Sequence, residues 1–315
     1  MAKYLVTGGA GFIGSNIAKE LVRLGEEVVI FDNLSTGKRE NISNISAKVK
    51  FIEGDLRDIS LIKNACSGID YVLHQAALPS VQRSVEDPAG TSEVNIIGTL
   101  NALIAAKDAK VKRFIYAASS SAYGDTPTLP KREDMKENPL SPYAVSKLTG
   151  ENFTKVFFRI YGLETVILRY FNVFGPSQDP ASQYSAVIPL FITAMLKGVS
   201  PVIYGDGKQS RDFTFVENVV SANILASKAQ NKEALGKMMN IACGDAFSLN
   251  DMIATLNEIM GKDVKPKYDE GRKGDIKHSL ADISLAKRLI GYTPKFTFKE
   301  GLKKTIEWYK SRSKG

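Results

Sequence analysis

The chain has 315 residues, of which 43% are hydrophobic and 24% are charged, as is typical of a soluble globular protein that buries a sizeable core. No apolar run reaches the ~18 residues of a membrane-spanning helix, and the N-terminal MAKYLVTGG lacks the layout of a signal peptide. We therefore expect a cytoplasmic protein without a membrane partner. The two cysteines form no CxxC pair, and two histidines argue against a histidine-based metal site.

Basic residues exceed acidic ones, 42 to 34, which gives a formal charge of +8. They are scattered along the chain, and no RNP, zinc-finger or helix-turn-helix signature accompanies them. We therefore expect no nucleic-acid partner. The surplus suits a lysine-rich exterior that also attracts an anionic small molecule.

The first half alternates between buried strands and amphipathic helices. In chain order the expected elements are strand 3–8, helix 12–25, strands 27–32, 49–55 and 70–77, helix 92–109, strand 113–119 and helix 143–162. Strand, helix and strand in succession predict a Rossmann-type doubly wound parallel α/β sheet. The second half has shorter elements, more Pro and Gly, and expected helices at 186–198, 248–261 and 298–311.

We therefore expect two domains with a soft boundary near Phe174. Residues 1–174 form the sheet domain. Residues 175–315 form a smaller mixed α/β lobe, some segments of which return to the first domain.

The sequence TGGAGFIG, between the first strand and the first helix, has the features of a phosphate-binding loop. It matches GxGxxG through Gly9, Gly11 and Gly14, and GxxGxxG through Gly8, Gly11 and Gly14. Glycine is needed because the turn is tight and the backbone approaches a pyrophosphate, at which the helix N-terminus points its N–H groups. The loop predicts that residues 1–174 bind a dinucleotide.

Two acidic residues follow at the ends of later strands. Asp32 can accept hydrogen bonds from both hydroxyls of the adenosine ribose and would repel a 2′-phosphate, which favours NAD over NADP. Lys38 and Arg39 lie nearby and leave NADP open. Asp55 either reaches the adenine amino group or serves as a turn or helix-cap residue.

The sequence SPYAVSK places Tyr143 and Lys147 one helical turn apart. A free tyrosine has a pKa near ~10, and a cation on the same helical face, together with an oxidised cofactor, favours the phenolate. YxxxK alone is more often a partly buried tyrosine beside a solvated lysine, because exposed lysines are the norm. However, Ser119, Ser120 and Ser121 end the preceding strand, where ligand sites of parallel sheets lie. The combination predicts a general acid/base site.

The chain resembles the extended short-chain dehydrogenase/reductases, and within them the nucleotide-sugar 4-epimerases. The motifs that carry the resemblance occur in the family's order and spacing over nearly the whole chain: TGGAGFIG, DNLSTG, GDLRD, HQAA, SSSAYG, SPYAVSK, LRYFNVFGP, GDGKQSRDF and GDIKHSLAD. The resemblance implies that Tyr143 takes the proton of the sugar 4-hydroxyl while C4 gives hydride to NAD. It implies that Lys147 also bonds the nicotinamide ribose and that Ser119 shares the proton network. The 4-keto sugar then turns over, hydride returns, C4 is inverted and NAD stays bound.

The resemblance also implies a set of ligand contacts. Expected cofactor contacts come from the glycine loop, the strand ends and HQAA: Gly8, Gly11, Phe12, Ile13, Gly14, Asp32, Asn33, Asp55, Leu56, Gln75, Ala76 and Ala77, with Lys147. Asn172 matches a position that contacts the substrate phosphates, Arg211 and Arg272 match diphosphate-binding positions, and Asp275 matches a position near the nucleotide ribose. Guanidinium suits a diphosphate because it is planar and always charged. The remaining expected substrate contacts are Ser80, Arg83, Ser120, Ser121, Tyr143, Gln178 and Ser279.

The same segments distinguish among the family's reactions. Ser120, Ser121 and Ala122 stand where dehydratases carry an Asp-Glu pair and decarboxylating members carry a Glu, which favours a plain epimerase. Ser279 is small where glucose-restricted members have tyrosine, so the resemblance implies that UDP-N-acetylglucosamine and UDP-N-acetylgalactosamine fit.

Two alternatives stay open. One is another NAD-dependent sugar-nucleotide enzyme, such as a UDP-uronic-acid 4-epimerase or a reductase. The other is a non-catalytic NAD sensor, which would need Gly11 and Asp32 but none of the catalytic residues. The family also pairs subunits through helices around 92–109 and 143–160, so we expect a homodimer.

Overall fold

The computed structural model of the chain describes residues 1–179, 186–271 and 277–312. Its central element is a seven-stranded sheet of order β11-β6-β5-β4-β1-β2-β3, in which all neighbouring strands pair in parallel. The strands are β1 (Lys3–Thr7), β2 (Glu27–Asp32), β3 (Val49–Glu53), β4 (Tyr71–His74), β5 (Arg113–Ser119), β6 (Thr165–Tyr170) and β11 (Met238–Ile241). The order reverses between β1 and β4, which is the doubly wound arrangement predicted from the sequence.

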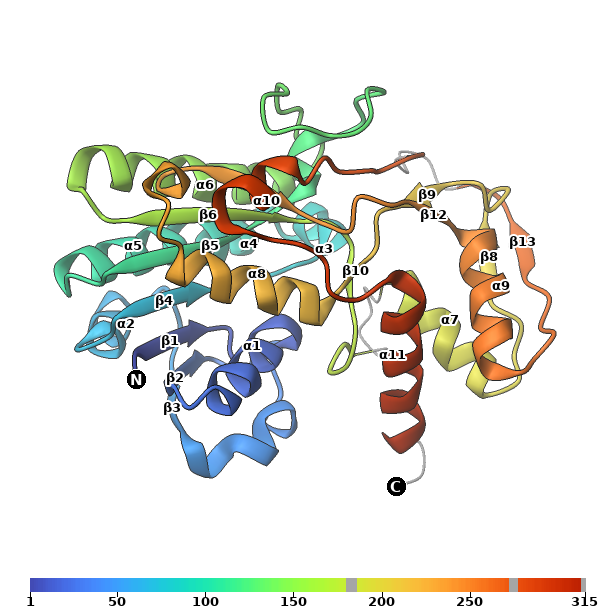
Figure 1. Ribbon diagram of the computed structural model, residues 1–315, viewed down its shortest axis with the longest axis horizontal. Coiled ribbons are helices and arrows are strands. Elements are labelled where there is room, and N and C mark those ends of the chain that lie inside the picture. Colours follow the sequence, from blue (N-terminus) through green and yellow to red (C-terminus); the bar gives the residue numbers. More distant parts are fainter. Residues whose placement is uncertain (180–185, 272–276, 313–315) are drawn as a thin grey trace.

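Helices cover both faces of this sheet (Figure 1). One face carries α2 (Ile59–Cys66), α5 (Gly98–Asp108) and α6 (Pro142–Tyr161). The other carries α1 (Phe12–Arg23), α8 (Val216–Lys228) and α10 (Ser284–Ile290). Shorter helical segments connect these layers: η1 (Arg39–Lys48), α3 (Val81–Glu86), α4 (Pro88–Ser92), η2 (Glu93–Ile97), η3 (Ser120–Tyr123) and η4 (Lys232–Ala234).

The strands are apolar on both sides because both faces are covered. Along β1, Tyr4 and Val6 enter the core beneath α1, whereas Leu5 enters the core beneath α2 and α5. Successive side chains of a strand point to opposite faces, so a strand between two helical layers reads as a continuous apolar run. This explains why KYLV and EVVIF lack polar alternation.

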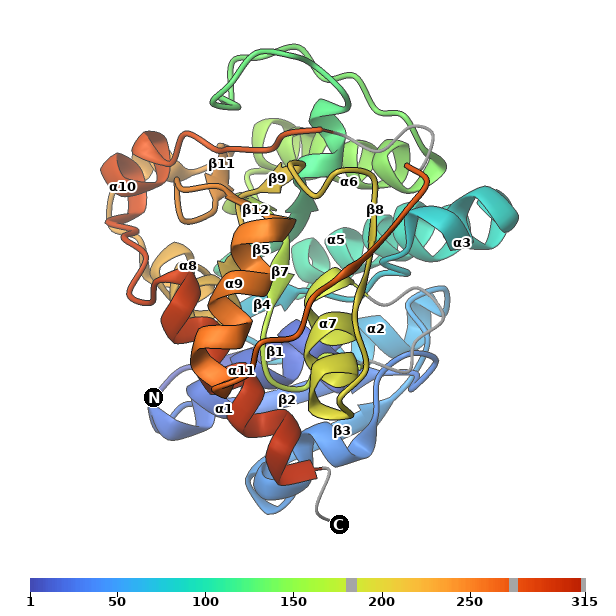
Figure 2. The same ribbon diagram turned by 90° about the vertical axis from the view of Figure 1, so that its right-hand side faces the viewer.

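A second, smaller lobe lies beside the carboxyl ends of the strands, on the right of Figure 1 and facing the viewer in Figure 2. Its core contains a group of stacked aromatic rings: Phe213 and Phe247 stack on Phe298, with ring centroids 5.3 Å and 4.5 Å apart. Segments beyond Phe174 therefore serve both lobes, because α8, β11 and α10 pack on the central sheet. The lobe's elements are β7 (Val173–Phe174), α7 (Val187–Leu196), β8 (Val202–Tyr204), β9 (Ser210–Arg211), β10 (Thr214–Phe215), β12 (Phe247–Ser248), α9 (Leu249–Met260), β13 (Lys267–Asp269) and α11 (Phe298–Arg312).

Within the described ranges, no helix is long and apolar enough to span a bilayer. In the same ranges, His, Cys, Asp and Glu side chains form no group of three or more that could hold a metal ion.

Candidate active site

A cleft of about 810 Å³, counting its open mouth, follows the carboxyl ends of β1 to β4. Apart from Lys147, every residue that the sequence predicts as a cofactor contact lines it. The cleft lies at the switch point of the strand order, where doubly wound sheets bind their ligands. The sequence analysis did not name seven further lining residues, of which Ser35, Thr36 and Gly54 lie within the motifs DNLSTG and GDLRD; the others are Phe31, Leu78, Pro79 and Val94.

The glycine loop fits a pyrophosphate because side chains would close it. Gly8 has a φ of +67°, and a Cβ there would lie 2.8 Å from the backbone of Ala76. A Cβ on Gly14 would lie 2.2 Å from the carbonyl oxygen of Gly8. Gly11 is the N-cap residue of α1, so no side chain covers the helix N-terminus. Backbone N–H groups at such a terminus suit an anionic group.

Asp32 is held in the cleft by backbone donors. The amide of Ala10 donates to Oδ2 at 2.9 Å and the amide of Leu34 donates to Oδ1 at 2.8 Å. Burial raises the pKa of this carboxyl, and the backbone hydrogen bonds oppose the rise. A carboxylate oxygen accepts more than one hydrogen bond, so Asp32 keeps acceptor capacity for ribose hydroxyls.

The two basic residues that left NADP open are paired with other groups. The Lys38 ammonium lies 2.6 Å from Oδ2 of Asp179. Arg39 pairs with Glu53 at 2.7 Å and places its guanidinium 4.4 Å from the ring centroid of Phe51. These contacts direct both cations to protein partners, which favours NAD over NADP.

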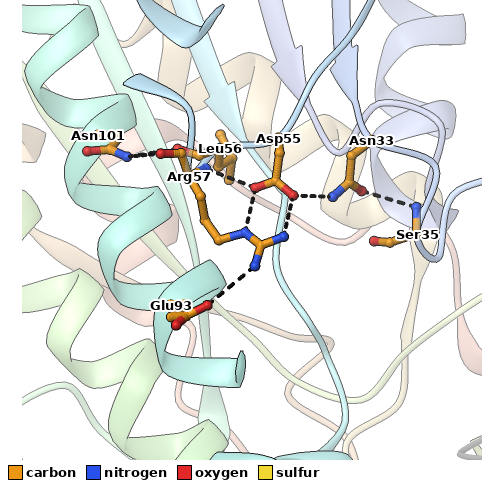
Figure 3. Close-up of polar contacts among 7 residues, drawn as sticks. All are labelled: Asn33, Ser35, Asp55, Leu56, Arg57, Glu93 and Asn101. Atoms are coloured by element: carbon orange, nitrogen blue, oxygen red, sulfur yellow. Dashed lines mark hydrogen bonds and ion pairs between the residues drawn. The ribbon is translucent and has the colours of Figure 1, made fainter. Parts of the chain in front are cut away.

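Asp55 is a turn residue that also lines the cleft (Figure 3). Its carboxylate accepts from the backbone amide of Arg57 at 2.9 Å and from the Arg57 guanidinium at 3.0 Å and 2.9 Å. Asn33 donates to Oδ2 at 2.9 Å, and Arg57 also reaches Glu93 at 3.3 Å. The pKa of Asp55 is therefore lowered, chiefly by Arg57. The turn role predicted as one of two alternatives is present, and a contact with adenine stays a prediction.

Helix α6 brings Tyr143 to Ser119 at the end of β5. The helix starts at Pro142, and the hydroxyl of its cap residue Ser141 accepts from the amide of Ala144 at 3.1 Å. The side chain of Ser119 is the hydrogen-bond partner of the Tyr143 hydroxyl. Ser119 Oγ in turn accepts hydrogen bonds from the hydroxyl and the backbone amide of Ser121, at 2.9 Å and 3.2 Å. The predicted catalytic tyrosine and serine are therefore neighbours in a hydroxyl network.

The expectation that Lys147 and an oxidised cofactor together lower the Tyr143 pKa stays a prediction, and in the protein alone this pKa is raised. Burial raises the pKa of Tyr143, and the hydrogen bond with Ser119 is what opposes the rise. The sequence argument counted charge along the helix but omitted desolvation, which disfavours a phenolate. A bound oxidised cofactor would add positive charge that acts in the opposite direction.

Lys147 is buried rather than solvated, so the simpler interpretation of YxxxK is wrong. Its side chain lies beneath the active site, with Nζ 4.8 Å from the ring centroid of Tyr116, and the residue is only 4% exposed. Burial lowers the pKa of Lys147 to about 8, and the nearby carboxylate of Glu151 opposes this. The ammonium charge and burial together lower the pKa of His74 to about 3, so this histidine is neutral.

The structure adds a residue that the sequence analysis missed, Asn95. It lies in η2, a short π-helical stretch, and its amide bonds both the N–H and the carbonyl of Leu78 at 2.8 Å and 3.2 Å. Asn95 also donates to Ser146 at 3.0 Å, and Ser146 donates to the carbonyl of Tyr143 at 2.8 Å. Because Leu78 lines the cleft, Asn95 joins the cofactor wall to the catalytic helix. An asparagine inside an otherwise apolar helix pattern was the available signal.

Three predicted substrate residues of the second lobe lie close together. Asn172 donates its side-chain amide to the carbonyl of Asp212 at 3.0 Å, next to Arg211. Arg211 donates to the carbonyl of Ser210 at 3.0 Å, and the same carbonyl accepts from the amide of Ser279 at 3.0 Å. The predicted diphosphate and sugar contacts therefore come from neighbouring, hydrogen-bonded segments of the chain.

The other predicted substrate residues are less uniform. Ser80 caps α3 by accepting from the amide of Arg83 at 3.1 Å, and α3 contacts α6 through Ser84, which accepts from the amide of Tyr143 at 3.0 Å. Gln178 lies against α11, where its carbonyl accepts from the Tyr309 hydroxyl at 2.6 Å. Two further predicted contacts, Arg272 and Asp275, lie outside the described residues.

Comparison with known proteins identifies the relatives of this chain. The sequence model of the NAD dependent epimerase/dehydratase family matches residues 4–242. The structure of a UDP-N-acetylglucosamine 4-epimerase from Methanobrevibacter ruminantium M1, in complex with UDP-N-acetylmuramic acid, is 42% identical and superimposes with a TM-score of 0.94 over 99% of both chains. A UDP-glucose 4-epimerase from Thermotoga maritima with UDP-glucose is 37% identical, with a TM-score of 0.93 over 99% of both chains. A UDP-glucuronate 4-epimerase from Thermodesulfobacterium geofontis is 36% identical over 98% of this chain and 97% of its own length.

Proposed function

Because the chain belongs to the NAD dependent epimerase/dehydratase family, we propose that it interconverts UDP-N-acetylglucosamine and UDP-N-acetylgalactosamine by inverting C4. The observation that carries the reaction type is the hydroxyl network of Tyr143, Ser119 and Ser121. The turn after β5 holds Ser120, Ser121 and Ala122 and supplies no carboxylate to eliminate water or assist decarboxylation.

The residues divide the work of a reversible proton transfer. NAD, held in the cleft lined by Gly11 and Asp32, would supply the acceptor and the donor of the C4 hydride. Tyr143 accepts the 4-hydroxyl proton and later returns it, and Ser119 bridges the tyrosine and the sugar hydroxyl. Lys147 supports the phenolate by its charge and orients the nicotinamide ribose. Proton and hydride both return to the substrate, so atoms and electrons balance over the cycle.

The choice of sugar rests on Ser279. The backbone amide of Ser279 donates to the carbonyl of Ser210, which also accepts from the Arg211 guanidinium. The side chain of Ser279 is only a hydroxymethyl group. A tyrosine in this place would occupy the room of an acetamido group, and overpacking a rigid site costs ~1–3 kcal/mol. The 42% identical relative named as a UDP-N-acetylglucosamine 4-epimerase is consistent with this choice.

A substrate panel with a matched variant tests the proposal. We expect C4 inversion of UDP-N-acetylglucosamine, measured by NMR of the sugar anomeric signals. Ser279→Tyr should lower kcat/KM about 5- to 150-fold for the acetylated sugars, as 1–3 kcal/mol implies, but far less for UDP-glucose. The matched control is Ser284→Tyr on α10. A wild-type enzyme inactive on UDP-N-acetylglucosamine, or equal losses on both substrate classes, contradicts the assignment.

The panel also separates the alternatives. Preferential turnover of UDP-glucuronate, the substrate in the name of the 36% identical relative, would favour a uronic-acid epimerase. A protein that binds NAD but turns over no sugar nucleotide would be the non-catalytic sensor. The buried Lys147 argues against a sensor, since burying an ammonium is costly and NAD binding alone does not require it.

We further propose a homodimer formed through α6 and the η2–α5 helix. Apolar side chains stand exposed on these helices, with Ile160 the most exposed at 70%; the others are Ile97, Val145 and Val156. Covering them with the same surface of a second copy would form a four-helix bundle. Analytical ultracentrifugation should show a dimer that Ile160→Glu weakens. A monomer at micromolar concentration contradicts this arrangement.

A further inference from the structure

Glu151 lies one helical turn beyond Lys147 on α6, as Lys147 lies one turn beyond Tyr143. Residues four apart share a helical face, so the three side chains form a row. Glu151 is fully buried, and both carboxylate oxygens accept from Arg169 of β6, each at 2.8 Å. Nothing in the proposed reaction uses this acid.

The ion pair extends into a row of alternating charges. Nη2 of Arg169 also donates to Oε1 of Glu137 at 3.1 Å. The Arg169 side chain is 0% exposed and that of Glu137 is 31% exposed. Positive and negative groups therefore alternate from Lys147 through Glu151 and Arg169 to Glu137 at the surface.

Lys147 needs such a counter-charge. In the part of the chain that the structure describes, no carboxylate forms an ion pair with its ammonium, and the Tyr116 ring is a neutral neighbour. A buried ammonium without an opposite charge tends to lose its proton. Glu151 is the carboxylate whose charge acts on Lys147.

We propose that Glu151 is a positioning residue that keeps Lys147 charged and aimed at the active site, with Arg169 fixing the carboxylate in place. This inference rests on the proposed role of Lys147 in acid/base catalysis and names the residue that maintains the charge which that role requires. The other interpretation is that Glu151 and Arg169 only pin α6 to β6.

The neighbouring groups leave Lys147 as the one that titrates near neutral pH. It faces His74 on β4, Tyr116 on β5, and Tyr143 and Glu151 on its own helix. The pKa of His74 is about 3, and the pKa values of Tyr116 and Tyr143 are raised by burial. Among Lys147, His74 and the two tyrosines, only Lys147, with a pKa of about 8, changes charge between roughly pH 6 and 9.

The test is direct titration of Lys147 in the purified holoprotein. Lysine Cε signals are followed by NMR against pH in isotopically labelled protein, and Lys147 is assigned by its loss in Lys147→Arg. Glu151→Gln keeps the shape of the side chain and removes its charge. We expect the Lys147 midpoint to fall by about one unit or more, and the alkaline limb of kcat to move to lower pH by the same amount.

Glu137→Gln is the matched control, because it removes the other carboxylate that pairs with Arg169 and leaves Glu151 in place. It should leave the Lys147 midpoint unchanged. Glu151→Asp, which keeps the negative charge, should lower the midpoint less than Glu151→Gln does. An unchanged midpoint in Glu151→Gln, or an equal shift in Glu137→Gln, overturns the proposal.

Glu151→Gln leaves Arg169 buried with one partner and can fail to fold. Glu151→Gln/Arg169→Met then carries the test, because it removes both buried charges while Lys147 still loses its counter-charge. Here too an unchanged Lys147 midpoint overturns the proposal. The titration uses no substrate, so a shifted midpoint in a protein without epimerase activity would refute the proposed function and not this inference.

Discussion

Replacing Gly14 by alanine should weaken both the fold and NAD binding. A Cβ at this position lies 2.2 Å from the carbonyl oxygen of Gly8 and 2.9 Å from the Cα of Gly9. Non-bonded atoms settle near ~3.5 Å, so α1 and the glycine loop must separate by about 1 Å. Such overpacking costs ~1–3 kcal/mol. The better helix propensity of alanine returns up to ~1 kcal/mol, so the free energy of unfolding should fall by up to about 2 kcal/mol.

Replacing Gly11 by alanine separates the two effects. Its backbone is extended, with φ −76° and ψ −179°, and the nearest atom to a Cβ is the Gly8 oxygen at 3.1 Å. This contact is tight, but the loop needs to give by only a few tenths of an ångström, so the strain is much smaller than at Gly14. The methyl group stands where the pyrophosphate approaches the helix N-terminus. NAD affinity should fall about 5- to 150-fold, as 1–3 kcal/mol implies, with stability near that of the wild type.

Two measurements on NAD-stripped protein check this pair. Chemical denaturation gives the free energy of unfolding without ligand, and calorimetric titration gives the NAD dissociation constant. The expected pattern is loss of stability and affinity in Gly14→Ala, and loss of affinity alone in Gly11→Ala. Wild-type NAD affinity in Gly11→Ala would refute the placement of the pyrophosphate at this loop.

Three further predictions concern the site and the lobe beside it. Tyr143→Phe should lower kcat by ~10²–10⁴-fold, because it removes the acid/base hydroxyl, while NAD content and Tm stay unchanged; the exposed Tyr161→Phe on the same helix is the control, and near-normal turnover by Tyr143→Phe contradicts the mechanism. Mass spectrometry of cofactor released by denaturation should show NAD, and a predominance of NADP would mean that Asp32 does not exclude a 2′-phosphate. Burial raises the pKa of Asp212 to about 6, so the folded state binds this proton more tightly than the unfolded chain, and the resulting stability is lost as pH rises from about 4 through 6. Asp212→Asn cannot ionise, so its Tm relative to wild type should rise over that interval, and a pH-independent difference would contradict the raised pKa.

Local order in the sequence was sufficient to predict the fold class and the family. The expected strands 27–32 and 113–119 coincide with β2 and β5, and the expected helix 143–162 begins one residue after α6 does. Such elements depend on residues within a few positions of one another, through apolar periodicity, helix caps and glycine turns. In contrast, α8 and β11 were not predicted. β11 has only four residues and no period of its own before it pairs with β6. α8 is a 13-residue helix that the sequence analysis overlooked.

The sequence by itself was sufficient to propose the residues of the site: the glycine loop, Asp32, and a tyrosine and lysine one helical turn apart. Only the tertiary structure decided their electrostatic state. Desolvation raises the pKa of Tyr143, where the helical spacing had predicted a lower one, and Arg169, 18 residues beyond Glu151, joins it in a buried pair. Burial and long-range pairing follow from how β6, β5 and α6 pack together, and a charge's free energy depends on all that surrounds it, not on its neighbours along the chain.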